Sequence, residues 1–447
     1  MFGVDFMALF FAPLPNMQSA PFLFLALSKI FGIVGNYNEY SLYFLPFICG
    51  IATLVLTLKI AQILFAQNNF GFCVFITLIC GSLGLLHYTT EFKQYGIEAF
   101  VGFLLFYLYL KQISFYKFIA ISVICVLISH TGIFVAFGVI VGYVKFIPLQ
   151  KIIVNNRAVL IFSVILMMIF LLYYIFYIRF QAVSNFYDYW KPWLIPLDSA
   201  QLPAFLIKIL PVWSGFTPFD KGFVIPIYMI VSIFGLISLY RKRRDIFMIC
   251  VCMLGIYVGL SFAQIYPFGH DGIIGGRLSL FMSVFFYVMC AFGAEFLYVR
   301  IGNKYWRFGI NFMLILLLAL SFYRYAQIPL KSRHHIQQTH AFITQISHEF
   351  ARSSAKKCVF IYEASKHAFL YYSYIDKANI PFATFGDNLD DLKRQIQNAK
   401  CSNAWVLASH YPSKDFDLQL EKVLKTFNQN ANIWRSKTGW GSILGRF

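Results

Sequence analysis

The stretch Glu91-Phe92-Lys93-Gln94-Tyr95-Gly96-Ile97-Glu98 gathers the residue types that handle charged ligands next to a strongly apolar run. Glu91, Gln94, Tyr95 and Glu98 follow the i, i+3, i+4, i+7 spacing, which predicts that they share one helical face. A polar stripe that enters a bilayer must face protein or water. Lys93 beside it could meet a phosphate group as a point charge. The pattern favours a polar cavity, and the alternative is an ion-pair cluster that only ends a helix.

A second stretch, from Tyr266 to Leu278, holds several glycines and begins an apolar run with Arg277. The glycines leave the backbone free to approach a ligand. Arg277 could grip a phosphate through two parallel hydrogen bonds, or it could extend its charged end to the membrane interface. His270 and Asp271 resemble an acid/base pair, although adjacent residues in a loop are weak support for one.

Two further polar stretches accompany these. Gln18 offers a donor and an acceptor just before Ser19-Ala20-Pro21, where Pro21 suits a first helical turn and Ser19 is expected to cap it. In the loop 180–221, aromatic residues including Trp190 either anchor the chain at a membrane interface or stack on sugar rings. His130 is expected in a turn rather than as a ligand.

The composition places these stretches in a membrane protein. The chain is 59% hydrophobic and 13% charged, against about 25% charged in average soluble proteins. Residues 1–330 contain only ten carboxylates, and charges at membrane depth mark functional sites more often than packing sites. The apolar runs predict spans, each near the roughly 20 residues that a crossing needs, at 42–66, 69–86, 94–110, 157–179, 222–240, 246–263, 277–297 and 306–323, with 114–146 as a broken stretch.

Basic residues set the expected orientation. Clusters around 111–117 and 145–157 flank the broken stretch, and the positive-inside rule puts both in the cytoplasm, so 114–146 is predicted to be a hairpin of two short helices. The run 241–244 fixes another cytoplasmic turn. The loops 86–94, 180–221 and 264–276 and everything after 324 then lie outside, with all carboxylates of residues 1–330 except Asp245 and Glu295 at or near the outer face. Residues 1–41 should also lie outside, and we expect a preceding helix to be missing from the sequence.

The last part of the chain has a different composition. Residues 331–447 carry 16 Lys and Arg against 9 Asp and Glu, and they predict a small α/β domain with a parallel or mixed sheet. Expected strands are 359–362, 382–385 and 404–408, and expected helices are 335–353, 366–375, 389–399 and 416–427. The basic surface suits anionic head groups or is simply solvated. Cys358 and Cys401 could pair in an oxidising compartment, but the sequence does not supply their distance.

The predicted fold class is a polytopic α-helical membrane protein of about ten membrane segments. It is divided into an external loop (1–41), a transmembrane domain (42–330) and an external α/β domain (331–447).

A family resemblance rests on the order of several short motifs. Gln18-Ser19-Ala20-Pro21, Glu39-Tyr40-Ser41-Leu42 and Glu91-Phe92-Lys93-Gln94-Tyr95 resemble the N-terminal half of GT-C type polytopic glycosyltransferases. Within that fold, the chain resembles bacterial lipopolysaccharide-modifying transferases related to protein mannosyltransferases and lipid A aminoarabinose transferases. The segment 187–196 is similar to the external Tyr-Trp-Pro loop of the family, and Tyr266-Pro267 with Arg277-Leu278 is similar to its later Tyr-Pro…Arg-Leu segment.

The resemblance implies a multi-pass enzyme of the bacterial inner membrane with a periplasmic C-terminal domain. It would transfer a sugar from a polyprenyl-phosphate-linked donor to a glycan, lipid or protein acceptor of the cell envelope. The implied substrate-binding residues are Gln18, Glu91, Lys93, Gln94, Tyr95, Trp190, Tyr266 and Arg277, with Lys93 and Arg277 on the phosphate.

One departure concerns catalysis. The acidic pair of the family lies in the first external loop, which would be upstream of Met1, so the catalytic residue is unknown and Glu91 is the candidate within the chain. The sequence shows no metal or cofactor signature, although a divalent metal stays possible, and no nucleic-acid partner is expected. The alternatives are a transporter or flippase of lipid-linked sugars, whose half-repeats are not found, and a catalytically degenerate membrane scaffold.

Overall fold

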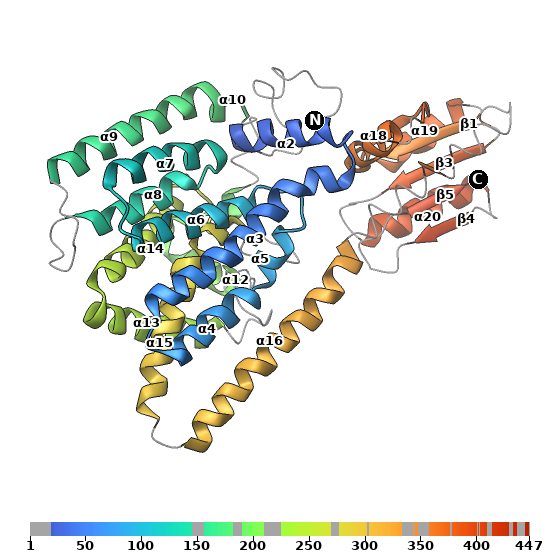
Figure 1. Ribbon diagram of the computed structural model, residues 1–447. Helices are drawn as coiled ribbons and strands as arrows, with labels where there is room; N and C mark the ends of the chain where they lie inside the picture. The colour runs from blue at the N-terminus through green and yellow to red at the C-terminus, as the bar shows by residue number, and fades with distance from the viewer. Residues whose placement is uncertain are drawn as a thin grey trace. The chain divides into compact units, whose positions relative to one another are not determined.

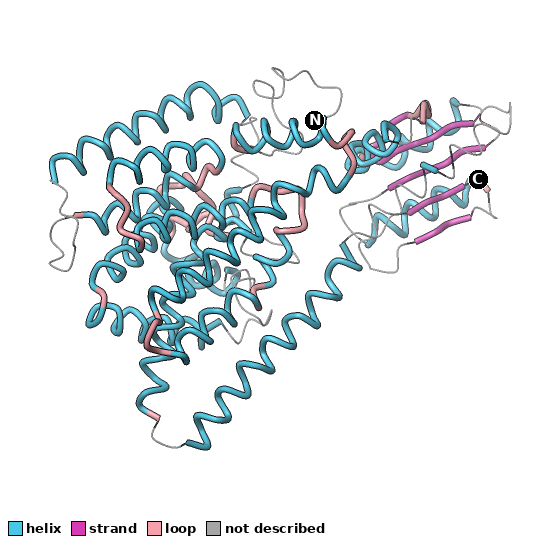
Figure 2. Tube along the Cα trace, viewed as in Figure 1, coloured by secondary structure: helices cyan, strands magenta, loops and turns pink. Residues whose placement is uncertain are grey.

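The structure is a computed structural model. The residues that it describes are 19–144, 156–181, 190–209, 225–269, 277–301, 304–332, 343–344, 346, 357–375, 378–399, 401, 403–408, 414–428, 432–435 and 443–446. The chain divides into two compact units, with the division after Tyr325. The first unit is helical, and the second contains a β-sheet (Figures 1 and 2).

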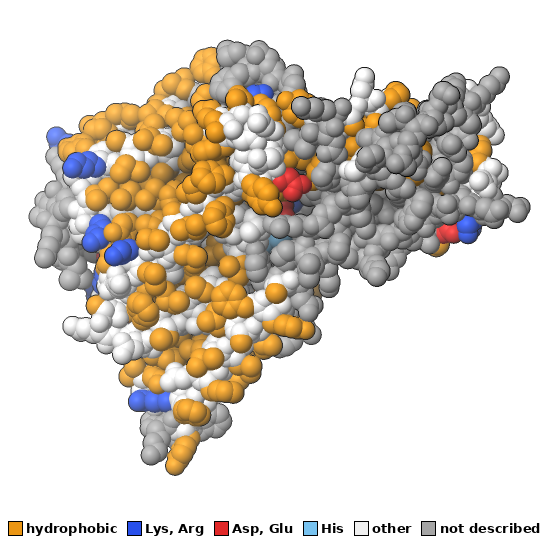
Figure 3. All heavy atoms as spheres, turned by 45° about the vertical axis from the view of Figure 1, so that its right-hand side comes forward, with side chains coloured by type: hydrophobic (Ala, Val, Ile, Leu, Met, Phe, Trp, Pro, Cys, Tyr) orange, Lys and Arg blue, Asp and Glu red, His pale blue; other side chains and the backbone are white. Residues whose placement is uncertain are grey.

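The helical unit is a bundle of apolar helices. Among its described residues it comprises α2 (Phe22–Val34), α3 (Glu39–Leu64), α4 (Asn69–Cys80), α5 (Leu83–Tyr88), α6 (Tyr95–Leu110), α7 (Phe115–Ile128), α8 (Gly132–Ile140), α9 (Asn156–Tyr173), α10 (Arg179–Gln181), α12 (Leu202–Ile209), α13 (Ile225–Lys242), α14 (Arg244–Phe262), α15 (Ser283–Arg300) and α16 (Lys304–Ser332), whose last residues enter the second unit. Apolar side chains cover much of the face shown in Figure 3, as a lipid-facing surface requires.

Four helical stretches are long and apolar enough to cross a membrane, judged by length and composition. They are Glu39–Leu64, Arg157–Ile178, Arg244–Phe262 and Arg277–Arg300, and shorter apolar helices accompany them. The predicted hairpin 114–146 is confirmed as α7 and α8, separated at 129–131. The predicted single span 69–86 is wrong, because the chain breaks at Gly81 and Ser82 begins α5 by accepting a hydrogen bond from the Leu85 amide. The predicted span 277–297 corresponds to the helical stretch Arg277–Arg300, whose first part, Arg277–Met282, is a 3-10 helix that leads into α15.

α6 lies in the core of the helical unit, and its two ends differ in chemistry. Its buried face includes Phe103, Phe106 and Tyr109, each 0% exposed. At its C-terminal end the Tyr109 hydroxyl donates to Asp245 (3.0 Å), which also pairs with Arg243 (2.8 Å). At its N-terminal end lies Glu98. The 16 residues of α6 span about 24 Å at 1.5 Å per residue, so the structure separates these carboxylates as the sequence predicted; which end faces the cytoplasm stays a prediction.

The second unit is built around a mixed five-stranded sheet in the order β2-β1-β3-β5-β4 (Figure 2). β1 (Lys357–Tyr362) pairs in parallel with β2 (Ala383–Phe385) and β3 (Asn403–Ala408), whereas β5 (Ile443–Arg446) runs antiparallel to β3 and to β4 (Asn432–Arg435). The three predicted strands are confirmed, and β4 and β5 were missed because each holds only two consecutive apolar residues. The predicted helix 335–353 falls almost wholly outside the described residues.

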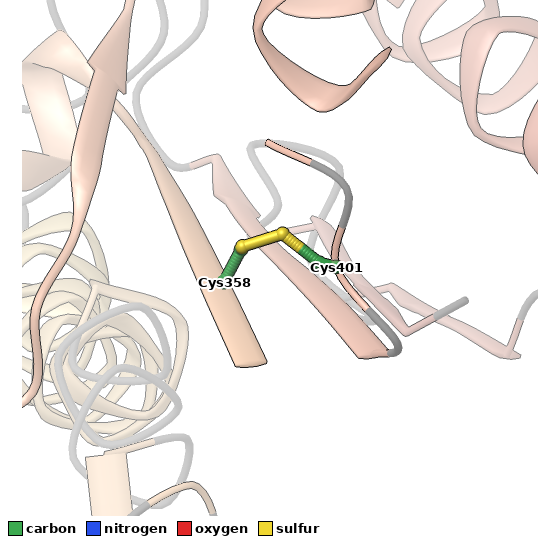
Figure 4. The surroundings of a disulfide bond; sticks show 2 residues. All are labelled: Cys358 and Cys401. Carbon is green, nitrogen blue, oxygen red and sulfur yellow. A yellow bond between two sulfur atoms is a disulfide. The ribbon is translucent and has the colours of Figure 1, made fainter. Parts of the chain in front are cut away.

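Helices cover both faces of this sheet. α19 (Leu389–Ala399) and α20 (Lys414–Phe427) pack on one face, through Leu392, Leu420 and their neighbours. α18 (Lys366–Ile375) packs on the other, through Phe369. These three helices match their predicted ranges to within two residues. Cys358 and Cys401 form a disulfide with a Cα–Cα distance of 5.9 Å (Figure 4), which settles the pairing that the sequence left open.

Candidate functional site

The loop between α5 and α6 carries Lys93 and differs locally from the prediction. Glu91, Phe92 and Lys93 form a bend, Gln94 is the residue before the helix, and α6 begins only at Tyr95. Gly96 permits this tight reversal, because a Cβ at this position would lie 2.5 Å from the Tyr88 carbonyl oxygen. The expectation that Glu91 shares a helical face with Gln94, Tyr95 and Glu98 is therefore wrong.

Two cations lie within electrostatic range of each other at this end of α6, although they are far apart in the sequence. Lys93 and Arg277 are both half-buried, and the Arg277 guanidinium lies 5.6 Å from the centre of the Tyr95 ring. Burial and the positive charge of Arg277 lower the pKa of Lys93 below its usual 10.5, and Glu91 opposes this change. Among the described residues neither cation forms an ion pair within 4 Å, so the pair is suited to hold an added anion.

Three tyrosines lie at the same end of α6 as these cations. The rings of Tyr88 and Tyr95 meet edge to face, with centroids 5.1 Å apart, and Tyr88 is close enough to Arg277 for electrostatic interaction. Tyr266 is close enough for electrostatic interaction with Tyr95 and Glu98. Aromatic faces can hold the guanidinium by a cation–π contact. The tyrosines thus form an amphipathic wall around the cation pair.

Two carboxylates lie near this wall, in different settings. Glu91 lies 3.8 Å from His87 and its side chain is 28% exposed. Glu98, in the first turn of α6, is only 2% exposed, and its Oε2 atom makes no hydrogen bond within the described part of the chain. Buried polar atoms are normally hydrogen-bonded. A carboxylate oxygen left in this state is an available acceptor for a ligand hydroxyl.

Hydrogen bonds from tyrosine hydroxyls to backbone carbonyls hold the segment that carries Arg277. The Tyr266 hydroxyl donates to the Leu278 carbonyl (2.8 Å), and the Tyr257 hydroxyl donates to the Phe268 carbonyl (2.6 Å). Gly102 of α6 allows close approach, since a Cβ there would lie 2.6 Å from the Phe281 carbonyl oxygen. These contacts place Arg277 at the N-terminal end of α6.

The loop that begins with Trp190 contacts the same segment. Trp190 is half-buried and precedes the short 3-10 helix Lys191–Trp193. The Trp193 carbonyl accepts a hydrogen bond from the Phe268 amide (2.8 Å). This bond ties the loop of Trp190 to the chain that leads to Arg277.

The structure brings Glu91, Lys93, Gln94, Tyr95, Tyr266 and Arg277 to the N-terminal end of α6. Gln18 lies outside the described residues, as do 182–189, His270 and Asp271. Sequence reasoning missed Tyr88 and left Glu98 out of the substrate-binding set; the i+7 spacing from Glu91 was a signal for Glu98, and no signal pointed to Tyr88.

The expected role of Ser19 is wrong. α2 starts at Phe22 after Pro21 without a side-chain cap, and the Ser19 hydroxyl instead contacts His130 Nε2 (3.1 Å) and donates to Gln181 Oε1 (2.8 Å). His130 lies in the turn between α7 and α8, as the sequence predicted. Among the described residues, no three His, Cys, Asp or Glu side chains lie together as metal ligands.

Comparisons with known proteins give the following. No protein-family model matches the chain, and no curated protein matches it. Two crystal structures of ArnT from Cupriavidus metallidurans are similar to it. The apo state has a TM-score of 0.38 at 12% identity and covers 99% of this chain and 89% of that one. The structure bound to undecaprenyl phosphate has a TM-score of 0.37 at 11% identity and covers 96% and 87%. ArnT is an aminoarabinose transferase of the GT-C type, the family named from the sequence motifs, and at these scores the likeness carries no statement about activity.

Proposed function

We propose that the protein is a membrane glycosyltransferase that moves a sugar from a polyprenyl-phosphate-linked donor to an acceptor of the cell envelope, such as a lipopolysaccharide, on the outer face of the inner membrane. The observation that carries this proposal is the meeting of Lys93 and Arg277 beside a tyrosine wall. The motifs that hold both residues are those that resemble the transferase family.

The cation pair fits the leaving group of such a reaction. When the bond between the anomeric carbon and the phosphate oxygen breaks, the phosphate leaves with the electron pair and gains negative charge. Positioned cations stabilise charge that develops in the transition state. Lys93 supplies a compact ammonium, and Arg277 supplies a fork of N–H donors that matches two phosphate oxygens.

The acceptor needs a base. Its hydroxyl oxygen forms the new bond to the anomeric carbon, and its proton passes to a carboxylate. Glu91 is the candidate named from the sequence, and it already contacts His87. Glu98 has a buried oxygen free of hydrogen bonds among the described residues. We assign Glu98 as the stronger candidate to contact a substrate hydroxyl, with Gln94 and the tyrosines lining the sugar site.

The test compares the envelope glycans of a deletion strain with those of strains that carry the wild-type gene, Lys93→Met or Arg277→Met. We expect mass spectrometry to show a sugar that is lost on deletion and restored by the wild-type gene but not by either variant, at equal protein levels. Lys111→Met is the matched control, because Lys111 is an exposed cation at the opposite end of α6. Unchanged glycans in the deletion strain would refute the proposal and favour the scaffold.

A further inference from the structure

A polar stripe on the α9–α10 region binds the backbone of the segment 19–22. α9 ends at Tyr173, a π-helical turn covers Tyr174–Ile178, and α10 ends at Gln181. Tyr173, Tyr177 and Gln181 are spaced by four residues. In an α-helix, residues four apart are rotated slightly relative to one another around the helix axis. The wider π turn reduces this rotation, so the three side chains stay on one face. Such π turns are frequent at functional sites.

These three side chains make a connected set of hydrogen bonds. The Phe22 amide donates to the Tyr173 hydroxyl (2.9 Å), and the Tyr177 hydroxyl donates to the Ala20 carbonyl (2.9 Å). Gln181 Oε1 accepts from the Ala20 amide (3.0 Å), and its Nε2 donates to the Tyr177 hydroxyl (2.8 Å). Gln181 is 0% exposed. The hydrogen bonds to residues 20 and 22 involve only backbone atoms of that segment, so they fix the course of the chain, and the Phe22 ring also meets the Tyr177 ring edge to face at 5.7 Å.

The stripe also caps α2. The first amides of a helix have no intrahelical partner, and Pro21 offers no side-chain oxygen for them. The Tyr173 hydroxyl, at the end of α9, accepts the hydrogen bond of the first α2 amide instead. The stacked rings of Tyr173 and Tyr177, 5.1 Å apart, hold both hydroxyls toward the segment.

Packing of α2 connects this arrangement to the candidate site. The Phe24 ring, 4% exposed, lies 5.7 Å from the ring of Phe92. Phe92 directly precedes Lys93. On the other side, residue 19 directly follows Gln18, the predicted sugar contact. A shift of the segment 19–22 would therefore move α2 against the loop of Lys93.

We propose that Tyr173, Tyr177 and Gln181 are positioning residues of the proposed transferase, which hold the segment after Gln18 and thereby set α2 against the loop of Lys93. This inference rests on the proposed function. The residues themselves do not contact the substrate.

The test uses Gln181→Leu and Tyr173→Phe in the full-length protein, with Tyr174→Phe as the control, because Tyr174 is 47% exposed on the same π turn. Tyr173→Phe should speed hydrogen exchange of the peptide that contains Ala20 and Phe22 by about five- to tenfold, as the loss of one hydrogen bond implies. Gln181→Leu should speed it at least as much, because it removes the bonds to Ser19, Ala20 and Tyr177. We expect the glycan modification to fall about tenfold, the same free-energy loss expressed as a rate, and the affinity for undecaprenyl phosphate to fall with it, because the segment sets the loop that carries Lys93.

The possible results separate the two proposals. Faster exchange with normal glycan modification, or exchange equal to that of the wild type, would refute the positioning role and leave the transferase standing. Loss of modification together with faster exchange throughout the helical unit would also refute it, because that result indicates general disruption. Normal modification by Lys93→Met would instead count against the proposed function, while the exchange data would still report whether the stripe holds the segment.

Discussion

Replacing Lys93 by methionine should weaken phosphate binding without weakening the fold. Methionine keeps a long unbranched side chain and removes the charge. The lowered pKa of Lys93 means that the folded protein without ligand disfavours the charged ammonium, mainly through burial and through Arg277. Removing the charge should therefore leave the thermal midpoint of unfolding unchanged or raise it.

The environment of the Lys93 side chain sets how much affinity for undecaprenyl phosphate the Lys93→Met variant should lose. Two unit charges about 4 Å apart interact by about 4 kcal/mol at an effective dielectric constant of about 20. Desolvation reduces this, and hydrogen bonds to charged groups contribute about 1.5–3 kcal/mol net. Because Lys93 is half-buried, the lower part of this range applies. This corresponds to an increase in Kd of about 10- to 30-fold.

The assay is binding of undecaprenyl phosphate to purified protein, measured together with thermal unfolding. Lys242→Met is the contrasting variant. It removes the partner of Glu295 (2.7 Å), whose side chain is 11% exposed. An unpaired buried acceptor costs about 1–3 kcal/mol, so this variant should lower the midpoint and leave binding unchanged.

Two results would refute the reasoning. Wild-type affinity in Lys93→Met would show that the ammonium does not meet the phosphate. Weaker binding together with a lower unfolding midpoint would show that Lys93 supports the fold, in the way expected of Lys242. Only weaker binding at an unchanged or higher midpoint agrees with an anion site.

Three further predictions concern other groups. Glu98→Gln should reduce sugar transfer by about 10²–10⁴-fold and Glu91→Gln by less, with lipid-phosphate binding retained; a larger effect of Glu91→Gln in glycan mass analysis would reverse the assignment. Affinity for undecaprenyl phosphate should fall as the pH rises toward 10.5, because Lys93 loses its proton below that usual value, and a titration of Lys93→Met should lack this fall. Cys401→Ser should destabilise the second unit by about 2–4 kcal/mol, seen as faster limited proteolysis, and an unchanged rate would argue against a structural role of the bond to Cys358.

Local patterns predicted the elements of this fold well where their signal was long or strongly punctuated. The helical hairpin followed from the break at Ser129-His130-Thr131 and from the basic clusters on both sides of it. The amphipathic helix α19 and its neighbouring strand β3 followed from their periodicity. The strands β4 and β5 each hold only two consecutive apolar residues, which is too few for a pattern, and the break at Gly81 was hidden in an apolar run.

The site was predicted by residue type more successfully than by geometry. Lys93, Tyr95 and Arg277 were named from their motifs, and the structure brings them together. Helical spacing placed Glu91 on α6, but the chain reverses at residues 91–93 because Gly96 lets it approach the Tyr88 carbonyl. Ser19 followed the usual preference for a helix cap, and a buried glutamine from a distant helix overrode it.

The sequence by itself determined the membrane class, the hairpin and the α/β character of the C-terminal unit, because hydropathy and periodicity are properties of neighbouring residues. Only the tertiary structure decided that Lys93 lies within electrostatic range of Arg277, that Glu98 is buried with one oxygen that makes no hydrogen bond to the described residues and that Gln181 binds the segment after Gln18. Such contacts depend on how separate helices pack, and no spacing along the chain encodes the distance between them.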